Sequence, residues 1–144
     1  MAHEKFLIAV FGILFLVVVP VCGEEIHNAV KEGDIARVES LLVKKPEKIN
    51  AKEKDDLTPL HYAAMHGHKD VSELLIGKGA NVNAKTKLGF TPLHYAKNKD
   101  ISALLISKGA DVNAKTKLDF TPLHYAAMYA HEDVAEILRS HGGE

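Results

Sequence analysis

Histidine is the residue whose number and spacing could do chemistry in this chain, because a neutral imidazole binds metal ions and transfers protons near neutral pH. The 144 residues include nine histidines, and three of them, His61, His94 and His124, recur at one motif position. They are 33 and 30 residues apart, too distant in sequence for a shared ligand set, so we interpret them as structural. His66 and His68 form a close pair, but two ligands alone make a weak metal site.

The sequence lacks the other common catalytic motifs. His131-Glu132 begins like the His-Glu-x-x-His helix of zinc proteases, but the second histidine would fall on residue 135, which is Ala135. There is no Gly-x-Ser-x-Gly segment and no glycine-rich phosphate loop. The single cysteine, Cys22, lies in an apolar N-terminal segment. We therefore expect no enzymatic activity, no cofactor and no metal ion.

The histidines belong to a longer pattern that repeats along the chain. The tetrapeptide Thr-Pro-Leu-His occupies residues 58–61, 91–94 and 121–124. Residues 79–96 and 109–126 agree at 16 of 18 positions. A period near 33 residues indicates an array of stacked units, since each unit needs a neighbour to bury its apolar face.

Each unit is predicted to contain two helices and a loop. The threonine of the tetrapeptide caps the first helix, and the proline occupies its first position, where no N–H is needed. In the second helix, Val71, Leu74 and Leu75 have the spacing of a buried stripe, and Gly79 ends that helix. The polar segments 83–89 and 113–119 contain turn residues typical of hairpin-like loops.

These motifs resemble the ankyrin repeat: Thr-Pro-Leu-His-Tyr-Ala-Ala from residue 58, Gly67-His68, and Gly-Ala-Asp-Val-Asn-Ala from residue 109. The resemblance covers residues 24–143 and implies an all-α repeat solenoid, each unit a helix-turn-helix with a β-hairpin-like loop. It also implies that the tetrapeptide histidines bond locally and tie adjacent repeats. The predicted boundaries are 24–52 for an N-terminal cap repeat, 53–85 for the second repeat, 86–115 for a shortened third and 116–144 for the C-terminal one.

Several positions depart from the repeat pattern. The first unit lacks the tetrapeptide and is interpreted as a polar cap whose outer side carries His27, Lys31 and Glu32. The third unit is three residues short, which predicts a shortened first helix with intact stacking on both sides. Ala130 stands where the second unit has a glycine, and we expect a left-handed backbone there. Asp56 and Asp119 replace a loop glycine and suit the same conformation.

The N-terminal segment has its own pattern. Residues 6–19 are apolar or glycine, with Lys5 before them and small residues around a cleavage point after Gly23. This resembles a signal peptide over residues 1–23, so we expect an exported protein, secreted or periplasmic. Two alternatives stay open: a retained membrane anchor, since the run reaches 18 residues if extended to Gly23, and lipidation at Cys22.

Charge and stacking together direct attention to protein binding. The formal net charge is −1, which argues against general nucleic-acid binding. We expect a monomer that binds another protein, or a membrane only if the N-terminal segment is retained. Loop tips carry two lysines each at repeat spacing and neighbouring apolar groups, and the resemblance adds the exposed side of the first helix. Tyr62, Tyr95 and Tyr125 are expected to pack between repeats. The predicted partner-binding residues are Lys54, Leu57, Met65, His66, Lys85, Lys87, Leu88, Phe90, Lys115, Lys117, Leu118, Phe120, Met128 and Tyr129.

Overall fold

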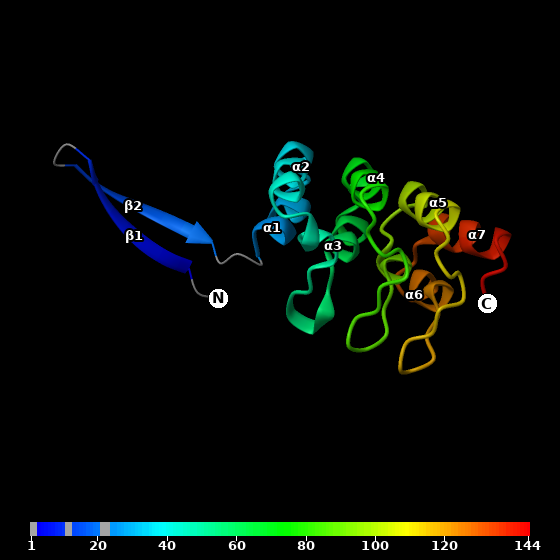
Figure 1. The fold of residues 1–144 in the computed structure, drawn as a ribbon. Helices are drawn as coiled ribbons and strands as arrows, with labels where there is room; N and C mark the ends of the chain where they lie inside the picture. The colour runs from blue at the N-terminus through cyan, green and yellow to red at the C-terminus, as the bar shows by residue number, and fades with distance from the viewer. Residues whose placement is uncertain (1–2, 11–12, 21–23) are drawn as a thin grey trace.

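The computed structural model describes residues 3–10, 13–20 and 24–144. From residue 24 the chain is an array of helix pairs joined by loops that project to one side (Figure 1). The paired helices are α1 (Glu24–Glu32) with α2 (Ile35–Lys44), α3 (Pro59–His66) with α4 (Lys69–Gly77), the 3-10 helix η3 (Pro92–Tyr95) with α5 (Lys99–Ser107), and α6 (Pro122–Met128) with α7 (Glu132–Ser140). Two further 3-10 helices, η1 (Pro46–Asn50) and η2 (Lys54–Asp56), connect the first two pairs. We call these pairs the first to fourth units.

The N-terminal segment contains two strands, β1 (His3–Val10) and β2 (Ile13–Pro20), which pair antiparallel with His3 opposite Pro20. The predicted cleavage point after Gly23 and the lipidation candidate Cys22 lie outside the described residues. Within the part of the chain that the structure describes, no helix combines the length and apolarity needed to cross a membrane. The signal peptide therefore stays a prediction.

Threonine and proline begin three of the first helices, as predicted. Thr58, Thr91 and Thr121 are the N-cap residues, and a proline follows each at the first helical position. The histidine three residues after each threonine closes a capping box, because its side chain bonds the backbone of the cap residue. This arrangement satisfies helix N–H groups that have no partner inside the helix.

The core follows the predicted stripes of the second helices. Val71, Leu75, Ile101, Leu105 and their equivalents in α2 and α7 are at most 3% exposed. Alanines of the first helices, such as Ala63 and Ala64, are fully buried beside them and allow neighbouring helices to approach closely. One hydrophobic cluster therefore runs from α1 to α7 without a break.

The third unit confirms the prediction of a short first helix with intact stacking. Its first helix is reduced to η3, which still packs between α3 and α6 and buries Leu93 at 1% exposure. The Asn98 side chain caps α5 by accepting a hydrogen bond from the Ile101 N–H at 3.0 Å. The Lys97 N–H donates to the carbonyl of Ala64 at 3.2 Å, which ties the shortened segment to the end of α3.

The predicted left-handed positions are confirmed. Ala130 has φ +55°, and Asp56 and Asp119 have φ +64° and +61°. Asp55 also has a positive φ of +63°, so the loop of the first two units turns through two aspartates.

One prediction about the first unit is wrong: His27 does not lie on its outer side. It is fully buried, and its Nε2 lies 2.9 Å from the carbonyl oxygen of Ala51. His27 precedes Gly33 by six positions, as His61 precedes Gly67, so it occupies the place of the tetrapeptide histidine. The first unit therefore keeps the histidine without the threonine and proline.

Candidate partner-binding surface

The loops between units form a hydrogen-bonded row. In each loop a backbone N–H donates to the carbonyl four residues later: Glu53 to Leu57, Thr86 to Phe90 and Thr116 to Phe120, at 2.9 to 3.0 Å. Neighbouring loops are joined by the Lys87 N–H on the Asp55 carbonyl and the Lys117 N–H on the Leu88 carbonyl. These bonds hold the loop tips in register on the side opposite the second helices (Figure 1).

All six loop lysines are exposed, namely Lys52, Lys54, Lys85, Lys87, Lys115 and Lys117. The first loop is nevertheless not basic, because it also carries Glu53 and two aspartates. Lys52 pairs with Asp56 at 3.5 Å, and Glu53 is taken by Lys31 of α1 at 3.2 Å. Burial alone would raise the pKa of Glu53, but hydrogen bonds from Tyr62 and Lys31 outweigh that effect and lower the pKa.

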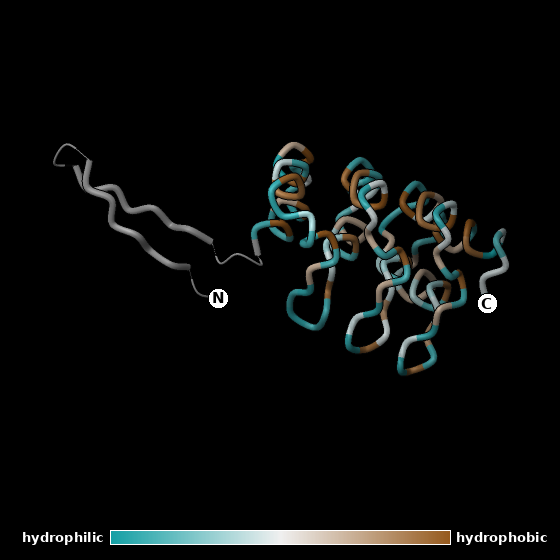
Figure 2. The backbone as a smooth tube through the Cα atoms, in the orientation of Figure 1, coloured by the Kyte–Doolittle hydropathy of each residue, from teal (hydrophilic) through white to brown (hydrophobic). Residues whose placement is uncertain are grey.

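Of the three loops, the second and third, residues 85–90 and 115–120, are therefore the basic ones. These carry four lysines against the single Asp119. Figure 2 shows the tip of the first loop as hydrophilic, whereas hydrophobic residues appear at the tips of the next two. We call these two segments the basic loops.

The apolar residues of the basic loops divide into tips and bases. Leu88 and Leu118 project into solvent with exposures of 60% and 77%. Phe90 and Phe120 are half-buried. The Phe90 ring packs against the rings of Tyr125 and Tyr95, with centroid distances of 5.0 Å and 5.4 Å. Leu57 of the first loop is half-buried as well. The exposed leucines can contact a partner, whereas the phenylalanines mainly pack at the base of the loops and stabilise them.

The tetrapeptide histidines tie each unit to the loop that follows. His61 Nδ1 accepts from the Thr58 N–H at 3.1 Å, and its Nε2–H donates to the Phe90 carbonyl at 3.1 Å. His94 repeats both contacts with Thr91 and Phe120. This confirms the implied tie between repeats for these two histidines.

Burial keeps these two histidines neutral. It lowers the pKa of His61 to about 4 and also lowers that of His94. Since the ring nitrogen that would take the proton already accepts an N–H, the neutral form is the one that fits the site. These two histidines therefore have a structural role, and neither ring nitrogen is free to transfer a proton.

The predicted tyrosines pack against the histidine of the preceding unit. Tyr62 meets His27, Tyr95 meets His61 and Tyr125 meets His94, all edge-on with ring centroids 5.7 to 6.1 Å apart. Histidine and tyrosine rings therefore alternate in a row along the first helices, on the side of the array that faces the loops.

The predicted residues at the ends of the first helices lie on this same row. His66 is exposed and stacks on His68 at 6.0 Å, while Met65 is half-buried. Met128 and Tyr129 are 56% and 60% exposed. Among the residues that the structure describes, no group of three or more His, Cys, Asp or Glu side chains could hold a metal ion.

Sequence reasoning missed the asparagines that clamp successive units. Asn83 accepts from the Asp111 N–H at 2.8 Å and donates to the Gly109 carbonyl at 3.0 Å. Asn113 makes the same two bonds to the C-terminal segment, and Asn50 accepts from the Asn81 N–H. The signal was present, since asparagine stands at the start of every loop segment.

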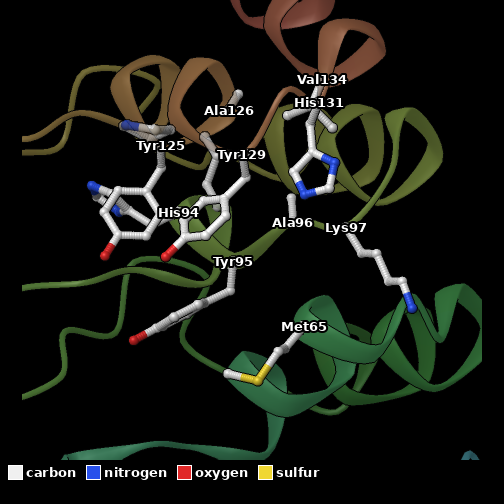
Figure 3. A pocket seen from close by; sticks show the side chains of 12 residues that line it. Met65, His94, Tyr95, Ala96, Lys97, Tyr125, Ala126, Tyr129, His131 and Val134 are labelled. Atoms are coloured by element: carbon white, nitrogen blue, oxygen red, sulfur yellow. The ribbon is translucent and has the colours of Figure 1, made fainter.

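A cavity of about 240 Å³, also not anticipated, opens between the ends of α3 and α6 (Figure 3). We call it the notch. Met65, Tyr95, Lys97, Tyr129 and His131 stand around it, and alanine, leucine, proline and valine side chains of η3, α6 and α7 form much of its floor. Two of the predicted binding residues, Met65 and Tyr129, therefore share one concave feature.

Comparison with known proteins agrees with the geometry of the array. A model of ankyrin repeats in three copies matches residues 26–116, and a model of ankyrin repeats in many copies matches residues 97–139. The chain is 41% identical over 46 residues to the transient receptor potential cation channel subfamily A member 1 homolog of Caenorhabditis elegans. That match covers 32% of this chain and 4% of the channel. The chain belongs to the ankyrin-repeat family, whose members are generally protein–protein interaction modules.

Proposed function

We propose that this chain is an exported, non-catalytic module of four ankyrin repeats that binds a partner protein through its basic loops and the adjoining ends of its first helices. The observation that carries the proposal is the register of the basic loops. Backbone bonds between loops hold the exposed Leu88 and Leu118 side by side among Lys85, Lys87, Lys115 and Lys117. Apolar groups within a positively charged rim are the composition of a docking surface.

The absence of a catalytic constellation in the sequence supports a binding role. His61 and His94 have both ring nitrogens engaged in structural bonds. The fold also suits binding, because a row of equivalent positions offers an extended surface to a macromolecule.

The proposal is tested by reversing the charge of the basic loops. A partner is first recovered from the native compartment on the immobilised chain, and its affinity is then measured with purified components. Replacing Lys85, Lys87, Lys115 and Lys117 by glutamate should weaken binding by at least about 30-fold, because like charges would then face the partner's acidic surface. Unchanged affinity would overturn the proposal.

A matched control reverses four lysines on or beside the second helices, which face away from the loops. These are Lys44, Lys69, Lys78 and Lys108, all exposed. The control changes the net charge by the same amount and should leave the affinity within about threefold of the wild type. Equal losses in the two variants would indicate a general charge effect.

Export is tested separately by the mass of the mature chain. A measured mass equal to that of residues 24–144 agrees with cleavage of residues 1–23. A mass that includes those residues favours the alternative, a membrane-associated adaptor that keeps its N-terminal segment and turns the basic loops toward an anionic surface.

A further inference from the structure

The notch exists because the third unit lacks the last turn of its first helix. In the second unit, residues 64–69 separate Ala63 from Asp70, whereas in the third only residues 97–99 separate Ala96 from Asp100. The α6 helix of the fourth unit again runs to Met128. The ends of α3 and α6 therefore face each other across a missing helical turn, as Figure 3 shows with Met65 on one side and Tyr129 on the other.

The lining of the notch combines an apolar floor with an aromatic wall. Leu93 and Ala96 of the floor are buried, and Tyr125 and Tyr129 stand together with ring centroids 5.5 Å apart. Burial raises the pKa of Tyr95 and of Tyr125, so these phenols keep their protons and can donate hydrogen bonds. This surface favours an apolar group with an acceptor beside it.

The charge of the lining is one-sided. Lys97 lines the notch together with His131, and no carboxylate does. Two acidic residues, Glu132 and Asp133, lie in the first turn of α7 beside the lining, and Asp133 already accepts a hydrogen bond from the Lys99 N–H at 3.2 Å. An incoming carboxylate therefore finds a cation at the rim without an acidic competitor in the wall.

The size of the notch points to a side chain. Its volume of about 240 Å³ is below the roughly 300–1,000 Å³ of pockets that enclose a whole small ligand. It can accept one bulky side chain, which is how an interface gains most of its energy from a buried anchor.

We propose that the notch receives one leucine or phenylalanine side chain from an acidic segment of the partner protein, and that Lys97 pairs with a carboxylate beside that anchor. This inference rests on the proposed function and adds a specificity site to it. The basic loops attract acidic segments in general, whereas the notch selects those with an apolar anchor.

The probes are short peptides with blocked termini. In three of them two glutamates precede one variable residue and two glutamates follow it. The variable residue is phenylalanine, leucine or alanine, and a fourth peptide flanks phenylalanine with lysines. The protein carries ¹³C-methyl methionine, so that Met65 in the wall reports occupancy while Met128, outside the lining, serves as an internal control. Binding constants follow from the titration.

We expect the acidic phenylalanine or leucine peptide to shift the Met65 signal, to leave that of Met128 in place, and to bind at least about tenfold more tightly than the alanine peptide. Lys97→Glu should remove the preference for the glutamate-flanked phenylalanine peptide over the lysine-flanked one, whereas Lys108→Glu should not. Tyr129→Ala should weaken binding, whereas Val43→Ala, at an exposed position of α2, should not.

A further variant closes the notch by restoring the missing turn. Replacing residues 97–98 with residues 64–68 of the second unit copies a sequence that already folds in this array, and it should abolish the anchor preference. The inference is overturned if no peptide shifts Met65, or if the alanine or lysine-flanked peptide binds as tightly as the acidic anchor peptides. In that case a loss of partner binding in the basic-loop variant would still uphold the proposed function. If instead the acidic anchor peptides shift Met65 while the basic-loop variant keeps its affinity for the partner, the proposed role of the loops is refuted and the inference about the notch stands.

Discussion

Acidification should destabilise this protein through its buried histidines, and His61 allows the size of the effect to be worked out. Burial lowers its pKa from 6.5 to about 4. Between these values the unfolded chain binds a proton that the folded chain does not, so stability falls as the pH drops below 6.5. At about 1.4 kcal/mol per pH unit, His61 should account for a loss of about 2 kcal/mol between pH 7 and pH 5, and the loss should level off near pH 4.

The assay is urea unfolding of the wild type, His61→Gln and His66→Gln at pH 7 and at pH 5, followed by circular dichroism. His61→Gln costs stability at pH 7, because its bonds to Thr58 and Phe90 change. Its further loss on acidification should nevertheless be about 2 kcal/mol smaller than that of the wild type. His66→Gln controls for the loss of one histidine from the same helix, because His66 is exposed.

Equal losses on acidification in the wild type and His61→Gln would show that His61 does not cause the acid sensitivity. A direct check is the NMR titration of the His61 ring in the folded protein. The ring should stay neutral at pH 5, and a midpoint near 6.5 would contradict the structural role assigned to it.

The remaining predictions concern backbone conformation. Ala130→Gly should stabilise the protein by about 1 kcal/mol, because Ala130 is exposed and holds a φ of +55°, and a lower urea midpoint would contradict this. Gly89→Ala should lower the free energy of unfolding by about 1 kcal/mol or more, since its φ is +85° and a Cβ there would lie 3.1 Å from the Thr116 Cα. Gly77→Ala is the control, because it ends α4 with nothing within 4 Å of an added Cβ. It should be neutral or stabilising by up to about 1 kcal/mol, and similar losses in both variants would argue against a conformational cause.

Local rules predicted much of this fold from the sequence. Threonine and proline begin helices, a stripe such as that of Val71 and Leu75 is buried, and a glycine or aspartate takes the left-handed turns. These features depend on a few neighbouring residues, so they can be recognised in a single sequence. Repetition strengthened each of them, because the same residue types return at equivalent positions.

Features that depend on packing between units were harder to anticipate. His27 looked like part of a polar cap because the threonine and proline that usually precede this histidine are absent, yet packing against α3 buries it fully. The first loop has the same two lysines as the others, but ion pairs to Lys31 and within the loop remove its basic character. Lysine count alone could not show which loops keep an unpaired positive charge.

The notch illustrates the same limit. The sequence predicts a shorter first helix in the third unit, but a missing turn could be closed by a shift of the neighbouring units. The structure keeps α3 and α6 in place on either side of η3, so the deletion appears as a concave feature. Residues from three units line the notch, and how close they lie to one another depends on the distance between stacked units.

Amide hydrogen exchange of the chain, with and without the recovered partner, tests whether the array binds on its loop side. The partner should protect residues 85–90 and 115–120 and the ends of α3 and α6. The helices α2, α4 and α5 on the other side should exchange at the same rate in both states. Protection confined to those second helices, with none in the basic loops, would contradict the claim that this array binds its partner on the loop side.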